Sequence, residues 1–262
     1  MFAIEQGSRL GNCEQKEKAL GLVLAGGKGT RFARSVSAST PKVLQPVLGK
    51  PLISYVLDTL REAGISRIIV VVGYGGNQVR DAIGSAVDYA YQDTQLGSGH
   101  AVMCALESFK NFEGPLVVMC GDSPLFKPET IRNMLRKRRE SLSTVVLASA
   151  LLENPTGYGR IIRDDTGKII QIVEESCADD AQRQIREVNG GAYVFWAPWL
   201  VCNIHRISKN AAGEYNLTDA VRLAIEQGNN VNVVRCEPDE IIGVNTPDDL
   251  QYAETILRRR GL

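Results

Sequence analysis

The sequence predicts an α/β fold built on a doubly wound, mostly parallel, Rossmann-like sheet. The 262 residues are 44% hydrophobic and 23% charged, which is enough apolar material for one large or two small domains. In the first half, short apolar runs alternate with segments of helical periodicity, as in parallel strands joined by crossover helices. Glycine-rich and polar motifs follow several of these runs, at the strand ends where such sheets bind ligands.

The first half is predicted to contain four strands and three helices. The run at 19–25 is apolar throughout, and the run at 67–72 is β-branched and ends at Gly73, so both indicate interior parallel strands. The segment 51–63 has apolar residues three and four positions apart and ends at Gly64, which indicates a helix. We also expect helices at 78–83 and 100–109 and strands at 87–91 and 115–120.

The second half is predicted to be a mixed β extension that covers the active-site crevice. We expect strands at 144–150, 159–164, 168–175 and 191–196, the middle two joined by an Asp-Asp-Thr-Gly turn. Helices at 217–227 and 248–260 should flank a last strand at 231–236. We expect residues 1–18 to be a loose extension and residues 19–262 to form a single domain.

Composition and charge exclude several classes of protein. Thirty basic residues balance thirty acidic ones, which argues against a nucleic-acid-binding protein. The six cysteines are scattered without a Cys-x-x-Cys pair, so we expect reduced thiols rather than a zinc site. With neither a membrane-spanning run nor a signal-peptide pattern, the sequence favours a cytoplasmic protein without a membrane partner. We make no prediction of its oligomeric state.

The segment 22–44, LVLAGGKGTRFARSVSASTPKVL, is predicted to be the active-site loop. Gly26, Gly27 and Gly29 follow the first strand, and their bare backbone N–H groups can approach an anion closely. The loop also carries three cations, Lys28, Arg31 and Lys42. A phosphate ligand suits both features.

Two common glycine motifs are absent from this loop. No Gly-Lys-Ser/Thr follows, so it is not a P-loop, and the third glycine of the dinucleotide fingerprint is missing. The structural alternative is a tight turn with solvated basic residues.

Asp122 directly follows the strand at 115–120 and should lie at the mouth of the crevice. A carboxylate facing a phosphate site favours Mg²⁺, which prefers hard oxygen ligands. Asn245 is a second candidate ligand for the metal or a phosphate. The alternatives are that Asp122 caps a turn or helix and that Asn245 is a helix N-cap.

Eight motifs appear in a recognisable order: LAGGKGTR, TPKVL, YQDTQLGSGHA, GDSPL, NPTGYGRI, IVEE, EVNGGAYVF and GVNT. From about residue 20 onward, the chain resembles the nucleotidyltransferases that make sugar nucleotides. It is most similar to the uridylyltransferase domain of the bacterial bifunctional N-acetylglucosamine-1-phosphate uridyltransferase. The resemblance implies an enzyme that joins a nucleoside triphosphate, UTP preferred, to a sugar 1-phosphate with Mg²⁺ as cofactor.

The resemblance also implies roles for residues and for halves of the chain. Residues 19–140 would bind the nucleotide, and residues 141–262 would bind the sugar and supply the C-terminal helix. The implied catalytic residues are Arg31, Lys42 and Asp122. The implied nucleotide-binding residues are Leu24, Ala25, Gly26, Gly27, Gly29, Thr30, Gln92, Gly97, Ser98 and Gly121. The implied sugar-binding residues are Gly159, Glu174 and Asn189, and the implied metal ligands are Asp122 and Asn245.

The chain departs from the family pattern in three places. The loop at 32–40 is longer than usual, and the chain ends where the acetyltransferase β-helix would begin, so we expect no acetyltransferase activity. Gly190 replaces a threonine, which we expect to remove a hydroxyl near the sugar. The base and sugar stay open to alternatives: glucose 1-phosphate or another sugar or alditol phosphate, with UTP, dTTP or CTP, because an amide such as that of Gln92 can flip. A non-catalytic sugar-nucleotide sensor is the alternative from another class.

Overall fold

The computed structural model describes residues 18–27, 29 and 40–261. Within them, nine strands form one sheet, whose main path runs β11-β7-β10-β6-β1-β4-β5. Their bounds are β1 (Leu20–Ala25), β4 (Arg67–Val72), β5 (Asp88–Tyr91), β6 (Pro115–Cys120), β7 (Val145–Leu151), β8 (Arg160–Arg163), β9 (Ile169–Val173), β10 (Glu187–Trp196) and β11 (Val231–Arg235). A two-stranded hairpin, β2 (Pro46–Val47) and β3 (Lys50–Pro51), lies apart.

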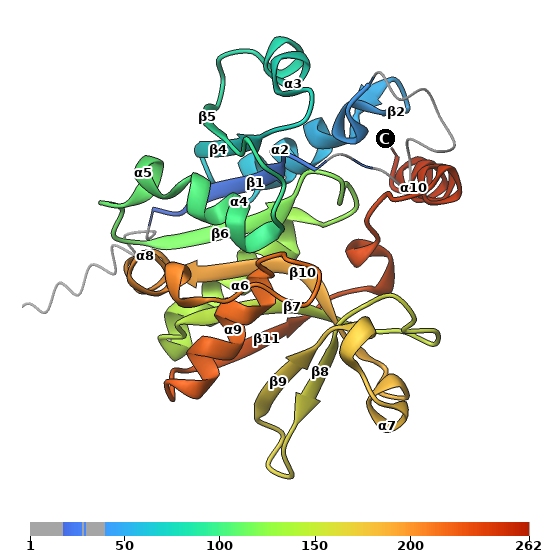
Figure 1. The fold of residues 1–262 in the computed structure, drawn as a ribbon. Helices are drawn as coiled ribbons and strands as arrows, with labels where there is room; N and C mark the ends of the chain where they lie inside the picture. Colours follow the sequence, from blue (N-terminus) through green and yellow to red (C-terminus); the bar gives the residue numbers. More distant parts are fainter. Residues whose placement is uncertain (1–17, 28, 30–39, 262) are drawn as a thin grey trace, which may run out of the picture.

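The sheet is mostly parallel. Strand β1 pairs in parallel with β4 and β6, β4 with β5, and β11 with β7, while β10 runs antiparallel to both β6 and β7. The β8–β9 hairpin joins the sheet only through β10 and projects from its end (Figure 1). The predicted fold class, an α/β sheet of mostly parallel strands with a mixed extension, is confirmed.

Helices cover both faces of this sheet. Their bounds are α2 (Leu52–Glu62), α3 (Gly76–Ile83), α4 (Ser98–Cys104), α5 (Leu106–Phe109), α6 (Pro128–Ser141), α7 (Asp180–Arg183), α8 (Ala197–Asn203), α9 (Leu217–Glu226) and α10 (Pro247–Arg259). Short 3₁₀ turns occur at Lys42–Leu44, Glu175–Cys177, Ile204–Arg206 and Pro238–Ile241. Helices α4, α5, α8 and α9 pack on one face, and α2, α3 and α6 on the other.

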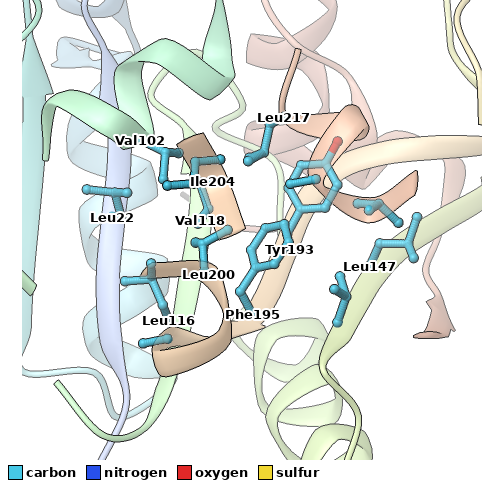
Figure 2. Close-up of a cluster of buried hydrophobic side chains, with 14 of the residues drawn as sticks. Leu22, Val102, Leu116, Val118, Leu147, Tyr193, Phe195, Leu200, Ile204 and Leu217 are labelled. Atoms are coloured by element: carbon cyan, nitrogen blue, oxygen red, sulfur yellow. The ribbon is translucent and has the colours of Figure 1, made fainter. Parts of the chain in front are cut away.

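The core follows from strand alternation, because successive side chains point to opposite faces. In β1, Leu20 and Leu22 face the cluster under α4 and α9, whereas Val23 faces the cluster under α2. Figure 2 shows Leu22 and Val118 in the first cluster with Phe195 of β10. The centre of the sheet thus holds the carboxyl ends of β1 and β6 side by side.

The predicted elements differ from the structure mainly at their ends. Strands β4 and β6 have the predicted bounds. The predicted helix at 100–109 is two helices, because Ala105 adopts φ −90° and ψ −5° between α4 and α5. Helix α6 lies where we predicted no element, and β10 begins at Glu187 rather than at residue 191. The predicted extension at 1–18 lies outside the described residues except for Lys18.

A third apolar cluster fastens the C-terminal helix. Ala253, Ile256 and Leu257 of α10 pack with Val47 and with Val244, and Figure 1 shows α10 beside β2. The loop that leads into α10 is thereby held beside β2. Asn245 is in that loop.

Candidate active site

The glycine segment after β1 is shaped by close approaches of its backbone. A Cβ on Gly26 would lie 2.8 Å from Oε1 of Gln92, so glycine alone fits there without a shift. Gly29 has φ +58°, and a Cβ on it would lie 2.9 Å from Cβ of Lys42. Both glycines therefore bring the loop against the side chains expected to act with it. Lys28, Thr30 and Arg31 lie outside the described residues, and so does the expected long loop at 32–40 except for Thr40.

A cavity of about 420 Å³ opens beside this loop. Ten of the predicted catalytic and nucleotide-binding residues line it: Leu24, Ala25, Gly26, Gly27, Gly29, Lys42, Gln92, Gly97, Ser98 and Asp122. Val43, Gln95, Ala101, Cys120 and Glu214 complete the lining and were not predicted. Glu214 precedes α9 by three residues, and no local sequence signal connects it with the glycine loop. Gly121 lies behind the lining, where its N–H donates to the carbonyl of Leu24 at 2.9 Å.

Lys42, Asp122 and Asn245 meet at one point. The Nζ of Lys42 forms an ion pair with Oδ2 of Asp122 and donates to Oδ1 of Asn245 at 3.1 Å. The side chains of Lys42 and Asp122 are 13% and 21% exposed, so the pair is shielded but reachable from the cavity. The metal and catalytic candidates from three distant parts of the chain are thus in direct contact.

Each of the three side chains is placed by its backbone surroundings. Lys42 begins a 3₁₀ turn directly after Pro41, and Asp122 follows the end of β6. The carbonyl of Asp122 accepts a hydrogen bond of 2.8 Å from the N–H of Val244. Oδ2 of Asp249, in the first turn of α10, accepts from the N–H of Asn245 at 2.9 Å. Helix α10 thereby holds Asn245 over Asp122.

These oxygens fit a Mg²⁺ ion that also binds substrate phosphates. The Lys42 ammonium already occupies the place between the Asp122 carboxylate and the Asn245 amide oxygen, so a cation suits that place. Across residues 18–27, 29 and 40–261, no three or more His, Cys, Asp or Glu side chains cluster at metal-ligand distance. A single carboxylate with an amide oxygen is typical of Mg²⁺ sites that take their remaining ligands from phosphates and water.

Cys120 lines the cavity next to Asp122 but is unsuited to act as a nucleophile. Burial raises the pKa of its thiol to about 12, and the Asp122 carboxylate adds to that rise while Lys42 opposes it. The reactive thiolate is therefore a rare species at neutral pH. The chemistry of the site lies with its charged groups.

The wall at Gly97 and Ser98 is built against Tyr215. Gly97 has φ +95°, and a Cβ there would lie 2.5 Å from the carbonyl oxygen of Tyr215. The N–H of Tyr215 donates to Leu96 and the N–H of Gly99 donates to Tyr215, both at 2.8 Å. The Oγ of Ser98 accepts from the N–H of Leu217 at 2.9 Å, at the start of α9. The wall is consequently fixed by two separate chain segments.

The predicted sugar-binding residues also cluster, away from the cavity lining. The N–H of Asn189 donates to the carbonyl of Gly159 at 2.8 Å, and a Cβ on Gly159 would lie 3.4 Å from Oε2 of Glu174. Glu174 accepts from the hydroxyl of Thr218 at 2.7 Å. Next to this cluster, Arg160 is 1% exposed and pairs with Glu175 at 2.7 Å. An ion pair between a buried arginine and a partly exposed glutamate thus lies next to the predicted sugar-binding residues.

Tyr193 connects the sugar cluster with the cavity. Nδ2 of Asn189 donates to its hydroxyl at 2.7 Å. Burial raises the pKa of Tyr193 strongly; the hydrogen bond from Asn189 opposes that rise, and the nearby Glu174 and Cys120 add to it. The start of α9 also joins the two groups, because the N–H of Leu217 donates to Ser98 and the hydroxyl of the next residue, Thr218, donates to Glu174.

The expectation for Gly190 is wrong. A Cβ at this position would lie 2.7 Å from Ile241 and 3.0 Å from the carbonyl oxygen of Ala148. Those atoms belong to the packed side of β10, opposite to the side chain of Asn189. The glycine therefore removes no hydroxyl from the sugar cluster; it permits the close packing of β10 on β7.

In the part of the chain that the structure describes, no helix is long and apolar enough to cross a membrane.

Comparisons with known proteins agree with this arrangement. The model of the nucleotidyl transferase family matches residues 20–238. The bifunctional protein GlmU of Caldanaerobacter subterraneus subsp. tengcongensis is 40% identical over 245 residues, which are 93% of this chain and 52% of that protein. GlmU of Exiguobacterium sp. is 40% identical over 242 residues, which are 91% of this chain and 52% of that protein. The chain thus spans about half the length of these relatives.

Among solved structures, a Bacillus anthracis protein assigned as a glucose-1-phosphate thymidylyltransferase superposes with a TM-score of 0.76. It is 21% identical, and the match covers 92% of this chain and 95% of that one. This likeness extends to the fold alone. With the family model matching from β1 into the turn after β11, the chain belongs to the nucleotidyl transferase family of enzymes.

Proposed function

We propose that this chain transfers the uridylyl group of UTP to N-acetylglucosamine 1-phosphate, forming UDP-N-acetylglucosamine and pyrophosphate. The observation that carries the proposal is the contact of Lys42 with Asp122 and Asn245 at the edge of a glycine-lined cavity. Such an arrangement suits a reaction in which charge on phosphates must be bound and positioned. The motif resemblance and the relatives at 40% identity support the choice of substrates.

In this proposal, the bonds change at the α-phosphorus. An anionic phosphate oxygen of the sugar phosphate attacks the α-phosphorus, and the bond from that phosphorus to the pyrophosphate oxygen breaks. No proton has to be removed from the nucleophile, so a general base is unnecessary. The backbone N–H groups at Gly26, Gly27 and Gly29 hold the triphosphate, and Lys42 turns from Asp122 toward the phosphates.

Arg31 and Thr30, which lie outside the described residues, belong to the proposed triphosphate site as well. Leu24, Ala25 and Gly121 form its floor, and Gln92, Gly97 and Ser98 hold the base. Gly159, Glu174 and Asn189 bind the amino sugar through hydrogen bonds to its hydroxyl and amide groups. Asp122 and Asn245 hold Mg²⁺, which, when bound, neutralises phosphate charge.

The test is a substrate panel. Purified protein with Mg²⁺ is given UTP, dTTP, CTP, ATP or GTP with N-acetylglucosamine 1-phosphate or glucose 1-phosphate, and pyrophosphate release is followed. We expect the highest kcat/KM for UTP with N-acetylglucosamine 1-phosphate, loss of activity with EDTA and recovery with Mg²⁺. Asp122→Asn, which keeps the shape of the side chain without its charge, serves as the inactive control.

Two other outcomes contradict the proposal in different ways. Faster release with glucose 1-phosphate or with another pyrimidine triphosphate would keep the reaction and replace the substrates. No release with any pair, while nucleotide binding still raises the melting temperature, would favour the sensor function.

A further inference from the structure

The amide group of Gln92 has a single orientation in the wall of the cavity. Gln92 is 4% exposed, and its Nε2 lies 3.0 Å from the carbonyl oxygen of Gly97. A carbonyl oxygen only accepts hydrogen bonds, so the amide atom that faces it must be the NH₂ group. The orientation of the amide therefore follows from its partner and not from the similar shapes of its two ends.

The second hydrogen of this NH₂ group points to His100. Nε2 of Gln92 lies 3.1 Å from Nδ1 of His100, in the first turn of α4. Since the amide nitrogen donates, Nδ1 must accept, and the imidazole is the neutral tautomer with its hydrogen on Nε2. The ring is held by stacking on Tyr215, with 6.2 Å between ring centroids and 23° between planes.

With both hydrogens in use, the amide presents only its oxygen to the base site. Oε1 lies against Gly26, where a Cβ would come within 2.8 Å, and both residues line the cavity. Turning the amide over would place Oε1 against the carbonyl oxygen of Gly97 and the lone pair of His100. The contact with the Gly97 carbonyl would become repulsive, and His100 could restore its own hydrogen bond only by moving its hydrogen to Nδ1, so flipping of the amide is disfavoured.

An acceptor in this place discriminates between pyrimidines. Uracil and thymine carry an N–H at ring position 3, which can donate to Oε1. Cytosine carries a lone pair at that position, which Oε1 repels. We propose that His100 is a positioning residue for base specificity: by accepting from Gln92, it keeps the amide oxygen turned to the base and favours uridine and thymidine nucleotides over cytidine nucleotides. This inference rests on the proposed function, because it requires the base to lie at Gln92.

The test compares kcat/KM for UTP and CTP, with one sugar 1-phosphate, in four forms of the full chain. His100→Asn places an amide oxygen near the position of Nδ1 and keeps an acceptor. His100→Leu fills similar space without an acceptor. Cys104→Ala is the control, because Cys104 lies one helical turn from His100 and touches the ring, with its Sγ 3.7 Å from Nε2 and 3.9 Å from Nδ1, while its removal keeps the imidazole acceptor.

We expect the wild type, Cys104→Ala and His100→Asn to prefer UTP. In His100→Leu the ratio of kcat/KM for UTP to that for CTP should fall about tenfold or more, since one net hydrogen bond corresponds to about that factor. The change should appear in the KM for nucleotide and leave the KM for the sugar phosphate unaltered. A general loss of structure would move both KM values and leave the ratio unaltered.

Two results would overturn the inference alone: an unchanged ratio in His100→Leu, or an equal loss in His100→Asn and His100→Leu, while the wild type still prefers UTP. A wild type that prefers a purine triphosphate, or that uses none, would overturn the proposed function together with this inference. The wild-type panel and the variant ratios thus separate the two failures.

Discussion

At the scale of single residues, Lys42 has the most consequential environment in the site. Its ammonium lies between a carboxylate and an amide oxygen at the cavity edge. It forms an ion pair with Asp122, and in our proposal it turns to the phosphates when substrate binds. Removing it takes away a positioned cation and leaves a shielded carboxylate without its partner.

We therefore expect Lys42→Ala to lower kcat/KM by roughly 10²- to 10³-fold, the usual effect of deleting one positioned charge-stabilising group. Pyrophosphate release is the measurement. Lys50→Ala is the matched control, because Lys50 pairs with Asp58 at the surface, where both side chains are 40% exposed. If the two lysine variants are equally active, Lys42 has no role at the reacting phosphates.

Glu187 is a paired carboxyl that contributes to the stability of the protein in acid. Burial alone would raise the pKa of its carboxyl, but hydrogen bonds from Arg163 at 2.7 and 2.8 Å and from Ser149 at 3.0 Å hold the pKa below the ordinary value of 4.5. A lowered folded-state pKa contributes stability above the unfolded-state pKa. That contribution is lost as the pH falls through the lower folded-state value.

Glu187→Gln should consequently flatten the dependence of the unfolding free energy on pH below about 4.5. Urea unfolding at pH 7, 5, 4 and 3 measures it, with the exposed Glu153→Gln as the control. If the unfolding free energy of Glu187→Gln falls as steeply below pH 4.5 as that of the wild type, the pair of Glu187 with Arg163 contributes nothing to this pH dependence.

At the scale of elements, Gly190 decides how closely β10 packs. Any Cβ at this position meets Ile241 at 2.7 Å and the backbone of Ala148 at 3.0 Å. Gly190→Thr should thus destabilise the protein by about 1–3 kcal/mol through overpacking. Urea unfolding measures this as a lower midpoint concentration. The KM for the sugar phosphate of the folded variant should be unaltered, since the added side chain points away from Asn189. A large change in that KM at unaltered stability would contradict this orientation.

Some helices and strands could be predicted from the sequence and others could not, for physical reasons. Strands β4 and β6 were predicted to the residue because continuous apolar runs are bounded by turn residues. Helix α6 was missed: only Thr130, Ile131, Met134 and Arg138 are buried along its charged sequence, so its apolar stripe is short. The start of β10 was missed because two glycines, at 190 and 191, imitate a turn inside a strand.

At the scale of the whole molecule, the sheet brings distant motifs together. Ligands of such sheets bind at the carboxyl ends of the strands, and this predicted that the glycine loop, Gln92 and Asp122 would lie together. The three do line one cavity. It did not predict that Lys42 would bond Asn245, because 203 residues separate them and the contact depends on the docking of α10. Glu214 was missed for a similar reason, since it reaches the cavity from a loop before α9.

The proposed reaction at this assembled site is attack by the sugar phosphate on the α-phosphorus of UTP. Phosphorus NMR of one reaction tests it most directly, with N-acetylglucosamine 1-phosphate that carries ¹⁸O in its non-bridging phosphate oxygens. We predict that all label remains in the nucleotide sugar, with one ¹⁸O in the bridge between the two phosphorus atoms, and that the pyrophosphate carries none. Label in the pyrophosphate, or a nucleotide sugar without ¹⁸O in that bridge, would rule out this attack.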